Sequence, residues 1–151
     1  MEELIGRLKQ LQANAFIYYT KAHGYHWDVE GILFEQFHSM FGEIYEDAWN
    51  SVDDWAEWIR RFGAKASFNA SEALMISNIK YDLSPDSSNP MAMLQSLYNS
   101  NAVMIEDLKN SFPIATQANE EGVANFIAER IDVHQKWQWK LRSSLMTTIN
   151  S

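Results

Sequence analysis

The sequence predicts an all-α protein, a four-helix bundle with one long crossover connection. Prolines and glycines are scarce, with 3 and 6 in 151 residues, which favours long helices over a many-stranded sheet. Four segments repeat apolar residues at steps of three or four, the period of an amphipathic helix. A much longer connection, residues 63–89, separates the second segment from the third. Hydrophobic residues make up 46% of the chain, enough for one core, so residues 1–151 are expected to form a single domain.

The first two predicted helices run from about Glu2 to His26 and from about Leu33 to Phe62. The apolar face of the first comprises Leu4, Leu8, Leu11, Ala15, Tyr19 and Ala22, and that of the second comprises Phe34, Phe37, Phe41, Ile44, Ala48, Val52, Trp55 and Ile59. Gly63 follows the second helix, where a glycine commonly supplies the left-handed residue that ends a helix. The tryptophans of this helix, Trp49, Trp55 and Trp58, are expected to bury a contact between two subunits.

The last two predicted helices follow the long connection. Asn89 is a suitable N-cap for the third helix, with Pro90 at its first position. This helix is predicted to end before Pro113, because the residue preceding a proline avoids the α region. The fourth is predicted from about Asn119 to Ile149, and a short helix is predicted at Ser71–Ser77 within the connection. This order of elements is the topology of a ferritin-like four-helix bundle with a short helix in the long crossover between the second and third helices.

Composition excludes several classes of site. The chain has no cysteine, which rules out disulfides, thiolate metal sites and cysteine nucleophiles and suits a reducing cytoplasm. Its first residues lack the basic and apolar regions of a signal peptide, and no run of about 18 apolar residues occurs, so a cytoplasmic location without a membrane span is expected. The formal net charge of −8 repels phosphate backbones and suits cations.

Two carboxylates and a histidine on the second predicted helix form a candidate metal site only if two subunits meet. Asp53 and Glu57 are four residues apart, so they share one face of the helix. His38 lies fifteen positions before Asp53, on the order of 20 Å along the axis, so it cannot reach them within one helix. If two copies pack antiparallel about a two-fold axis near Glu46, His38 of one copy lies level with the carboxylates of the other. Such a dimer holds two identical sites.

A second histidine completes the candidate ligand set. His26 ends the first predicted helix, and the turn that contains Gly31 can bring it beside His38. Two imidazoles and two carboxylates form a mixed nitrogen and oxygen set that suits Fe2+ and also Zn2+ or Mn2+. His23, three residues before His26, is interpreted as a structural neighbour of the site, and His134 as a hydrogen-bonded core histidine.

These residues resemble the signature of the Dps family, the mini-ferritins. The resemblance rests on the segment His26-Trp27-Asp28-Val29-Glu30-Gly31, on His38, and on the Asp53-x-x-x-Glu57 pair. Residues 72–79 resemble the crossover helix of that family, and residues 134–142 resemble its closing helix. The match covers nearly the whole chain, and its first half is the more specific.

The resemblance implies a homo-oligomeric cage, a dodecamer built from two-fold dimers, that stores iron and protects against peroxide. It implies ferroxidase sites in which His26 and His38 come from one subunit and Asp53 and Glu57 from its partner. The substrates implied are Fe2+ and peroxide or oxygen. Trp27, beside the first ligand, is then an aromatic side chain that can absorb reactive oxidant.

Two departures from the family pattern modify this expectation. The family has an aspartate four residues after the second histidine, and Gly42 stands there. We therefore expect one firmly bound iron and a weaker second one. DNA-binding members carry lysine-rich tails, whereas this chain opens with two glutamates, so no DNA binding is expected at physiological salt.

Three alternatives remain open from the sequence. The loss at Gly42 also fits a ferritin-like shell protein with a degenerate, non-oxidising metal site. The ligand set also fits a cage that binds zinc or manganese. A di-iron site within one subunit needs Glu-x-x-His on two helices. The chain has only Glu35-x-x-His38, since Ile131 stands three residues before His134.

Acids at the start of the fourth predicted helix, Glu120 and Glu121, fit the helix dipole or the lining of an entry pore.

Overall fold

The computed structural model describes residues 1–66, 69–81 and 89–146 and confirms the predicted ferritin-like bundle. The described residues form five helices and no strand. The helices are α1 (Glu2–Asp28), α2 (Phe34–Arg61), α3 (Ala70–Ile76), α4 (Pro90–Gln117) and α5 (Glu121–Leu145). None of these helices combines the length and the hydropathy needed to cross a lipid bilayer.

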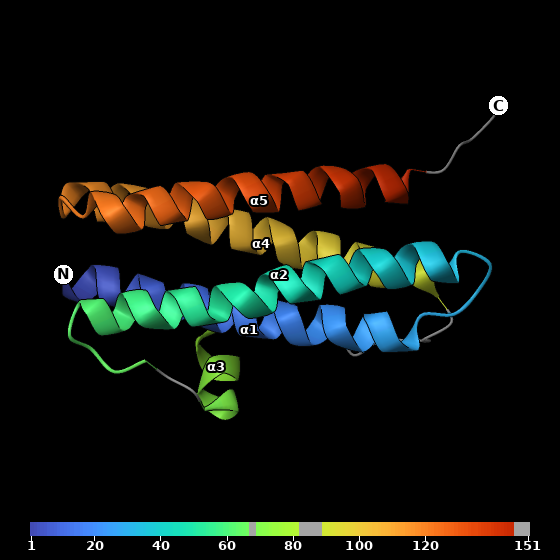
Figure 1. Ribbon diagram of the computed structural model, residues 1–151, viewed down its shortest axis with the longest axis horizontal. Helices are drawn as coiled ribbons and strands as arrows, with labels where there is room; N and C mark the ends of the chain where they lie inside the picture. The colour runs from blue at the N-terminus through green and yellow to red at the C-terminus, as the bar shows by residue number, and fades with distance from the viewer. Residues whose placement is uncertain (67–68, 82–88, 147–151) are drawn as a thin grey trace.

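The four long helices pack as two antiparallel pairs (Figure 1). Helices α1 and α2 form one pair and α4 and α5 the other, with α1 also packed against α4. Helices α2 and α4 run in the same direction. The short helix α3 lies against α1, on the side away from α4 and α5. One face of the α1–α2 pair is therefore left without a covering long helix.

The core is made by the apolar faces of all four long helices. The buried residues of α2 are Ser51 and six members of the predicted face: Phe37, Phe41, Ile44, Ala48, Trp55 and Ile59. The predicted Phe34 and Val52 are half-buried. Trp55 is buried within the subunit and packs on Phe126 of α5, with ring centroids 4.5 Å apart. The expectation that Trp55 buries a subunit contact is therefore wrong, because its ring fills the bundle core. Trp49, by contrast, is 52% exposed.

The predicted helix ends are confirmed where a specific capping residue marks them. The Asn89 side chain accepts a hydrogen bond from the Ala92 amide at the start of α4. Asn69 caps α3 in the same way, through the amides of residues 71 and 72. Gly63 has φ +86°, the left-handed conformation expected after the last turn of α2.

Helix α4 runs on through Pro113 to Gln117, so the prediction that it ends before the proline is wrong. A proline inside a helix costs about 3 kcal/mol through a lost hydrogen bond and a steric clash. The carbonyl that loses its partner belongs to Lys109, on the exposed face, where water can bond it. The apolar face meanwhile continues, because Leu108 and Ala115 are both fully buried. Packing of this last turn in the core offsets the local cost.

The fourth long helix begins later than predicted. Asn119 has φ +58° and ends the turn that follows α4, so α5 starts at Glu121. The described helix ends at Leu145, and the predicted end at Ile149 lies outside the described residues. The short crossover helix, predicted at residues 71–77, is observed one residue earlier.

Candidate metal centre

His26 and His38 lie face to face where α1 turns into α2. His26 is in the last turn of α1 and His38 is in the second turn of α2. Gly31, with φ +120°, permits the reversal between the helices. The two imidazole rings stack with centroids 3.8 Å apart and planes 17° apart. The predicted meeting of these two side chains is therefore confirmed.

Reciprocal hydrogen bonds hold this histidine pair. Nδ1 of His26 lies 2.6 Å from the backbone oxygen of His38, and Nδ1 of His38 lies 2.7 Å from the backbone oxygen of His26. A carbonyl oxygen only accepts, so each Nδ1 carries the hydrogen and donates it. Nε2 is then the nitrogen of each ring that can bind a metal ion. An imidazole that is fixed through Nδ1 and free at Nε2 is oriented for metal binding.

The two predicted carboxylate ligands lie elsewhere on the subunit. Asp53 and Glu57 are both exposed, one turn apart in the second half of α2. Within the described part of the chain, no three or more histidine, aspartate and glutamate side chains come together to hold a metal. One subunit therefore presents a histidine pair between the end of α1 and the start of α2, and a separate carboxylate pair in the second half of α2.

Gly42 lies directly under the His26 ring. A Cβ atom at this position would be 3.1 Å from Cε1 and 3.2 Å from Nδ1 of His26. The neighbouring ring must shift by a few tenths of an ångström to accept any side chain here. The family's carboxylate is therefore missing at position 42, and the His26 ring occupies part of the space that such a side chain would need.

An aromatic column runs along the exposed side of the α1–α2 pair beside the histidines. We define it as Tyr19, His23 and Trp27 of α1 with Tyr45 and Trp49 of α2. His23 contacts both Trp27 and Tyr45, each with ring centroids 3.8 Å apart. The pKa of His23 is lowered by desolvation and by the nearby His26, so its ring is neutral at pH 7. His23 is a neighbour of the histidine pair, as interpreted from the sequence.

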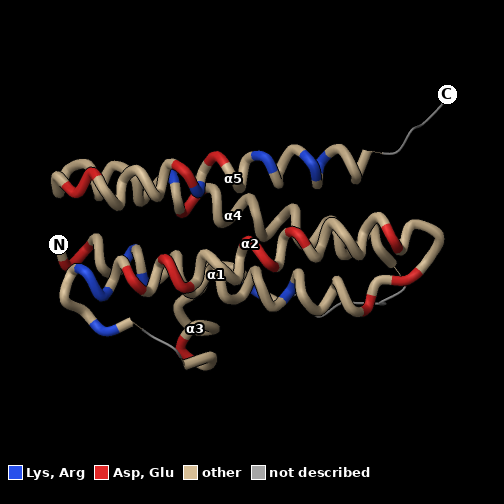
Figure 2. Tube along the Cα trace, viewed as in Figure 1, with Lys and Arg blue, Asp and Glu red and all other residues tan. Residues whose placement is uncertain are grey.

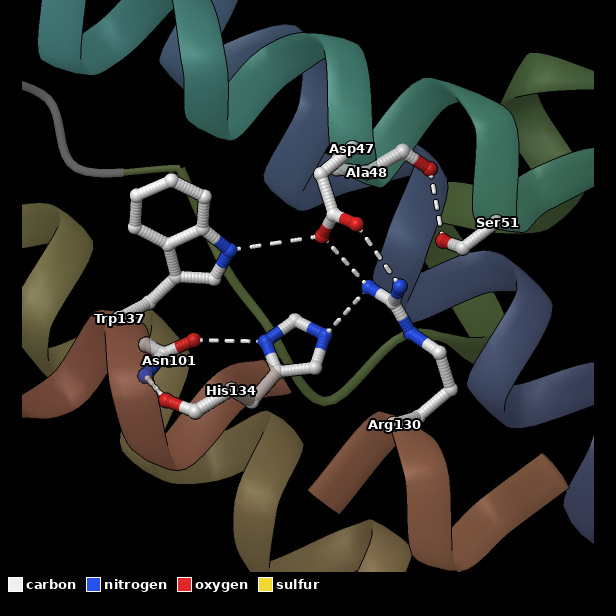
Figure 3. Close-up of polar contacts among 7 residues, drawn as sticks. All are labelled: Asp47, Ala48, Ser51, Asn101, Arg130, His134 and Trp137. Atoms are coloured by element: carbon white, nitrogen blue, oxygen red, sulfur yellow. Dashed lines mark hydrogen bonds and ion pairs between the residues drawn. The ribbon is translucent and has the colours of Figure 1, made fainter. Parts of the chain in front are cut away.

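A second polar cluster fills the bundle interior (Figure 3). Arg130 of α5 donates two hydrogen bonds to the carboxylate of Asp47 on α2, at 2.9 and 2.8 Å. His134 is buried beside them, with Nε2 3.1 Å from Arg130 and Nδ1 2.7 Å from Asn101 Oδ1. Trp137 donates from its indole nitrogen to Asp47 at 3.4 Å. Of this network, the sequence predicts only the core role of His134.

The network fixes the protonation of its members. Asn101 uses its amide hydrogens on the His134 carbonyl and on Gln138, so its oxygen accepts from Nδ1 of His134. Burial and the charge of Arg130 lower the pKa of His134 to about 3. Burial alone would raise the pKa of Asp47, but the hydrogen bonds and charge of Arg130 lower it below its usual value. This cluster therefore combines the Asp47–Arg130 ion pair with a neutral His134 imidazole.

Acid is expected to destabilise the fold through His134. The unfolded chain takes up a proton near pH 6.5, whereas folded His134 resists it until about pH 3. The contribution of His134 to the free energy of unfolding should thus fall by about 1.4 kcal/mol for each pH unit below 6.5. Urea unfolding across this range measures the slope. His134→Gln should flatten it, and an equal slope in that variant would contradict the assignment.

Sequence and structure comparisons agree on the class of protein. The ferritin-like domain family matches residues 5–149. An uncharacterized protein of Haemophilus influenzae is 30% identical over 148 residues, covering 98% of this chain and 91% of its own length. General stress protein 20U of Bacillus subtilis is 29% identical, covering 95% of this chain and 98% of its own. DNA protection during starvation protein 2 of Bacillus anthracis is 26% identical, covering 95% of this chain and 97% of its own length.

Solved structures match over nearly the whole chain. Dps from Staphylococcus aureus superposes with a TM-score of 0.92 at 26% identity and covers 97% of both chains. The DPS protein of Vibrio cholerae, described as a member of a broad superfamily of ferritin-like diiron-carboxylate proteins, gives a TM-score of 0.90 at 27% identity. This match covers 96% of this chain and 90% of the Vibrio cholerae chain.

The bundle and its crossover helix are those of the ferritin-like class. Within that class, the chain belongs to the Dps family.

Proposed function

We propose that the protein is a mini-ferritin cage subunit that binds Fe2+ and oxidises it at sites shared between two subunits. The observation that carries this proposal is the histidine pair, whose two Nε2 atoms are left free by the reciprocal Nδ1 hydrogen bonds. The Vibrio cholerae relative, described as a ferritin-like diiron-carboxylate protein, supports iron as the metal. Residues 1–151 act as a single Dps-type domain in the cytoplasm.

The ligand set is completed by a two-fold dimer. Antiparallel packing of two α2 helices about an axis near Glu46 places His26 and His38 of one subunit beside the partner subunit's Asp53 and the partner subunit's Glu57. Exposure of both carboxylates leaves them available for this contact. Each dimer then holds two identical sites, and six such dimers would close a dodecamer.

The donor set accounts for the proposed chemistry. Neutral imidazoles and carboxylates suit Fe2+, and they also suit Zn2+ or Mn2+, which would compete for the site. Four protein donors leave coordination positions open to an oxidant. When peroxide is the oxidant, two Fe2+ ions each give one electron, two protons are taken up, and two molecules of water and two Fe3+ ions result. Oxygen is the other candidate oxidant.

The activity is tested by adding Fe2+ to the apo-protein and following the absorbance of ferric-oxo species. A rise faster than that of Fe2+ in buffer alone, with peroxide or with oxygen, is the expected result. A rise no faster than in buffer would support the alternative function, a ferritin-like shell with a degenerate, non-oxidising metal site. The absence of a carboxylate at Gly42 is the observation that favours this alternative.

Gly42 is expected to limit each site to one firmly bound iron. Gly42→Asp supplies a carboxylate but forces the His26 ring to move, because its Cβ lies 3.1 Å from that ring. We expect the variant to raise the number of tightly bound Fe2+ ions per site from one toward two. Anaerobic calorimetric titration measures this number.

The matched control for that titration is Gly42→Ala, which adds the Cβ atom without a ligand. It should leave one tightly bound ion, held somewhat more weakly. Two equally tight ions in the unchanged protein would contradict the role given to Gly42.

We also propose that protection does not proceed through DNA binding. Acidic residues are spread over the helices, and basic residues lie on α1, near the end of α2 and along α5 (Figure 2). The net charge of −8 opposes binding to phosphate backbones. A gel-shift assay with linear DNA at moderate salt should show no retarded complex, and a retarded complex would contradict this proposal.

A further inference from the structure

Two carboxylates stand beside two arginines in the last turns of α2. Asp53 and Glu57 are four residues apart on one exposed face, and like charges at this spacing destabilise a helix. Arg60 and Arg61 follow Glu57 at three and four positions, where a cation commonly pairs with a glutamate. Within the described residues, neither carboxylate takes part in an ion pair. The repulsion between the two carboxylates is therefore not offset by either arginine.

Arg60 is held at the end of its own helix. Its Nη1 atom donates a hydrogen bond of 2.9 Å to the backbone oxygen of Ala64, in the turn that follows α2. Gly63 allows this turn through its φ of +86°. An arginine in the last turn also suits the negative end of the helix dipole. Arg60 therefore has a hydrogen-bond partner other than Glu57.

Arg61 is held on the face of a tryptophan. Its Cζ atom lies 4.1 Å from the ring centroid of Trp58, one turn earlier on α2. A cation over an indole face at an exposed site is held at least as strongly as a cation in a Glu–Arg pair at helical spacing. The stack on Trp58 therefore outcompetes an ion pair between Arg61 and Glu57.

Trp58 is itself fixed by a contact with α5. Its ring lies against Gly122, the second residue of α5, where a Cβ atom would be only 2.9 Å from Cη2 of the indole. Phe62 flanks the same ring, with centroids 6.0 Å apart. The Trp58 side chain is half-buried between these neighbours. The absence of a side chain at Gly122 thus permits the ring position on which Arg61 lies.

We propose that Trp58 is a positioning residue of the candidate metal centre, which holds Arg61 on its ring face and so leaves Glu57 free to bind a divalent cation. This inference rests on the proposed function, in which Glu57 is a ligand for Fe2+. A metal ion must displace any cation that is paired with its ligand, so an Arg61–Glu57 ion pair would compete with Fe2+. Trp58 acts through Arg61 and is not a ligand.

Trp58→Leu tests this role, because it removes the ring face and keeps an apolar side chain against Gly122. Arg61 can then pair with Glu57, and we expect the dissociation constant for Fe2+ to rise about two- to fivefold, as for competition with an exposed ion pair. Anaerobic calorimetric titration of the assembled protein measures the constant. Added salt should shrink the difference, since it screens an exposed pair, whereas a defect in folding would persist.

A second substitution separates the charge of Arg61 from the packing of Trp58. Trp58→Leu combined with Arg61→Gln should restore the affinity of the unchanged protein, because no arginine then competes for Glu57. The matched control is Trp58→Leu with Lys65→Gln, which removes an exposed positive charge beyond α2 and should not restore the affinity. If Trp58→Leu does not assemble, Trp58→Phe keeps a weaker ring face and should give a smaller rise, again reversed by Arg61→Gln.

The outcomes that overturn the proposal are distinct from failure of the iron site. An unchanged dissociation constant in Trp58→Leu, or a raised one that Arg61→Gln does not restore, would overturn the positioning role. Arg61→Gln alone should change the constant less than Trp58→Leu does. Binding several-fold tighter in that single variant would show that Arg61 already pairs with Glu57, which also overturns the role. Failure of the proposed function gives a different result, in which the unchanged protein itself binds no Fe2+.

Discussion

Replacing Asp53 and Glu57 together by Asn and Gln is expected to reduce iron oxidation by more than about 100-fold. Loss of the groups that merely support a metal ligand costs about 10- to 100-fold in affinity or activity, and loss of two ligands should exceed that. Both side chains are exposed on α2, so the fold and the helical content should be unchanged. Stopped-flow absorbance after Fe2+ addition measures the rate. Asp54→Asn, an exposed neighbour, is the matched control and should retain the activity.

A mixed dimer tests whether the ligands come from two subunits. His26→Ala with His38→Ala in one chain and Asp53→Asn with Glu57→Gln in the other should each be inactive alone. A heterodimer obtained by co-expression contains one site with all four ligands and one site with none. Activity should therefore return to about half of that of the unchanged dimer. Inactive heterodimers would contradict the shared site.

Asp47→Asn is expected to destabilise the protein by about 3–5 kcal/mol, because it leaves the buried Arg130 charge without its partner. The ion pair is 2.8 Å long, and Arg130 is buried within the bundle. Denaturant unfolding measures the change. Asp132→Asn, an exposed position on α5, should change the stability by less than about 0.5 kcal/mol.

A double variant distinguishes the loss of a partner from the loss of the pair itself. Replacing Asp47 by Leu and Arg130 by Met removes both charges and keeps apolar volume. Replacing a whole buried ion pair is often neutral or stabilising, so the double variant should be more stable than Asp47→Asn. A double variant no more stable than the single one would show that the geometry of the network, and not its charge, matters.

Periodicity predicted the long helices because each keeps its apolar face over many turns. The prediction was wrong at Pro113, where a local rule about proline competed with burial of Ala115 in the core. It was also wrong for Trp55, since a helical pattern alone does not separate a ring that faces the core from one that faces another subunit. At Pro113, tertiary packing overrides the local preference.

The candidate site was predictable in part. The turn between the helices predicted that His26 and His38 meet, but their reciprocal backbone hydrogen bonds depend on the register of α1 against α2, which the sequence does not state. Arg130 and His134 are four residues apart near the apolar face of the last helix, a signal of a buried polar cluster. Their partner Asp47 lies 83 positions away from Arg130, and only the fold brings it close.

Anomalous diffraction from crystals of the protein soaked in Fe2+, with data collected on both sides of the iron edge, tests the shared site most directly. We predict an iron peak bounded by His26 and His38 of one subunit and by the partner subunit's Asp53 and the partner subunit's Glu57, with a second peak of lower occupancy toward Gly42. An intact two-fold dimer with no iron at this position would contradict the account and leave a ferritin-like shell without oxidising activity.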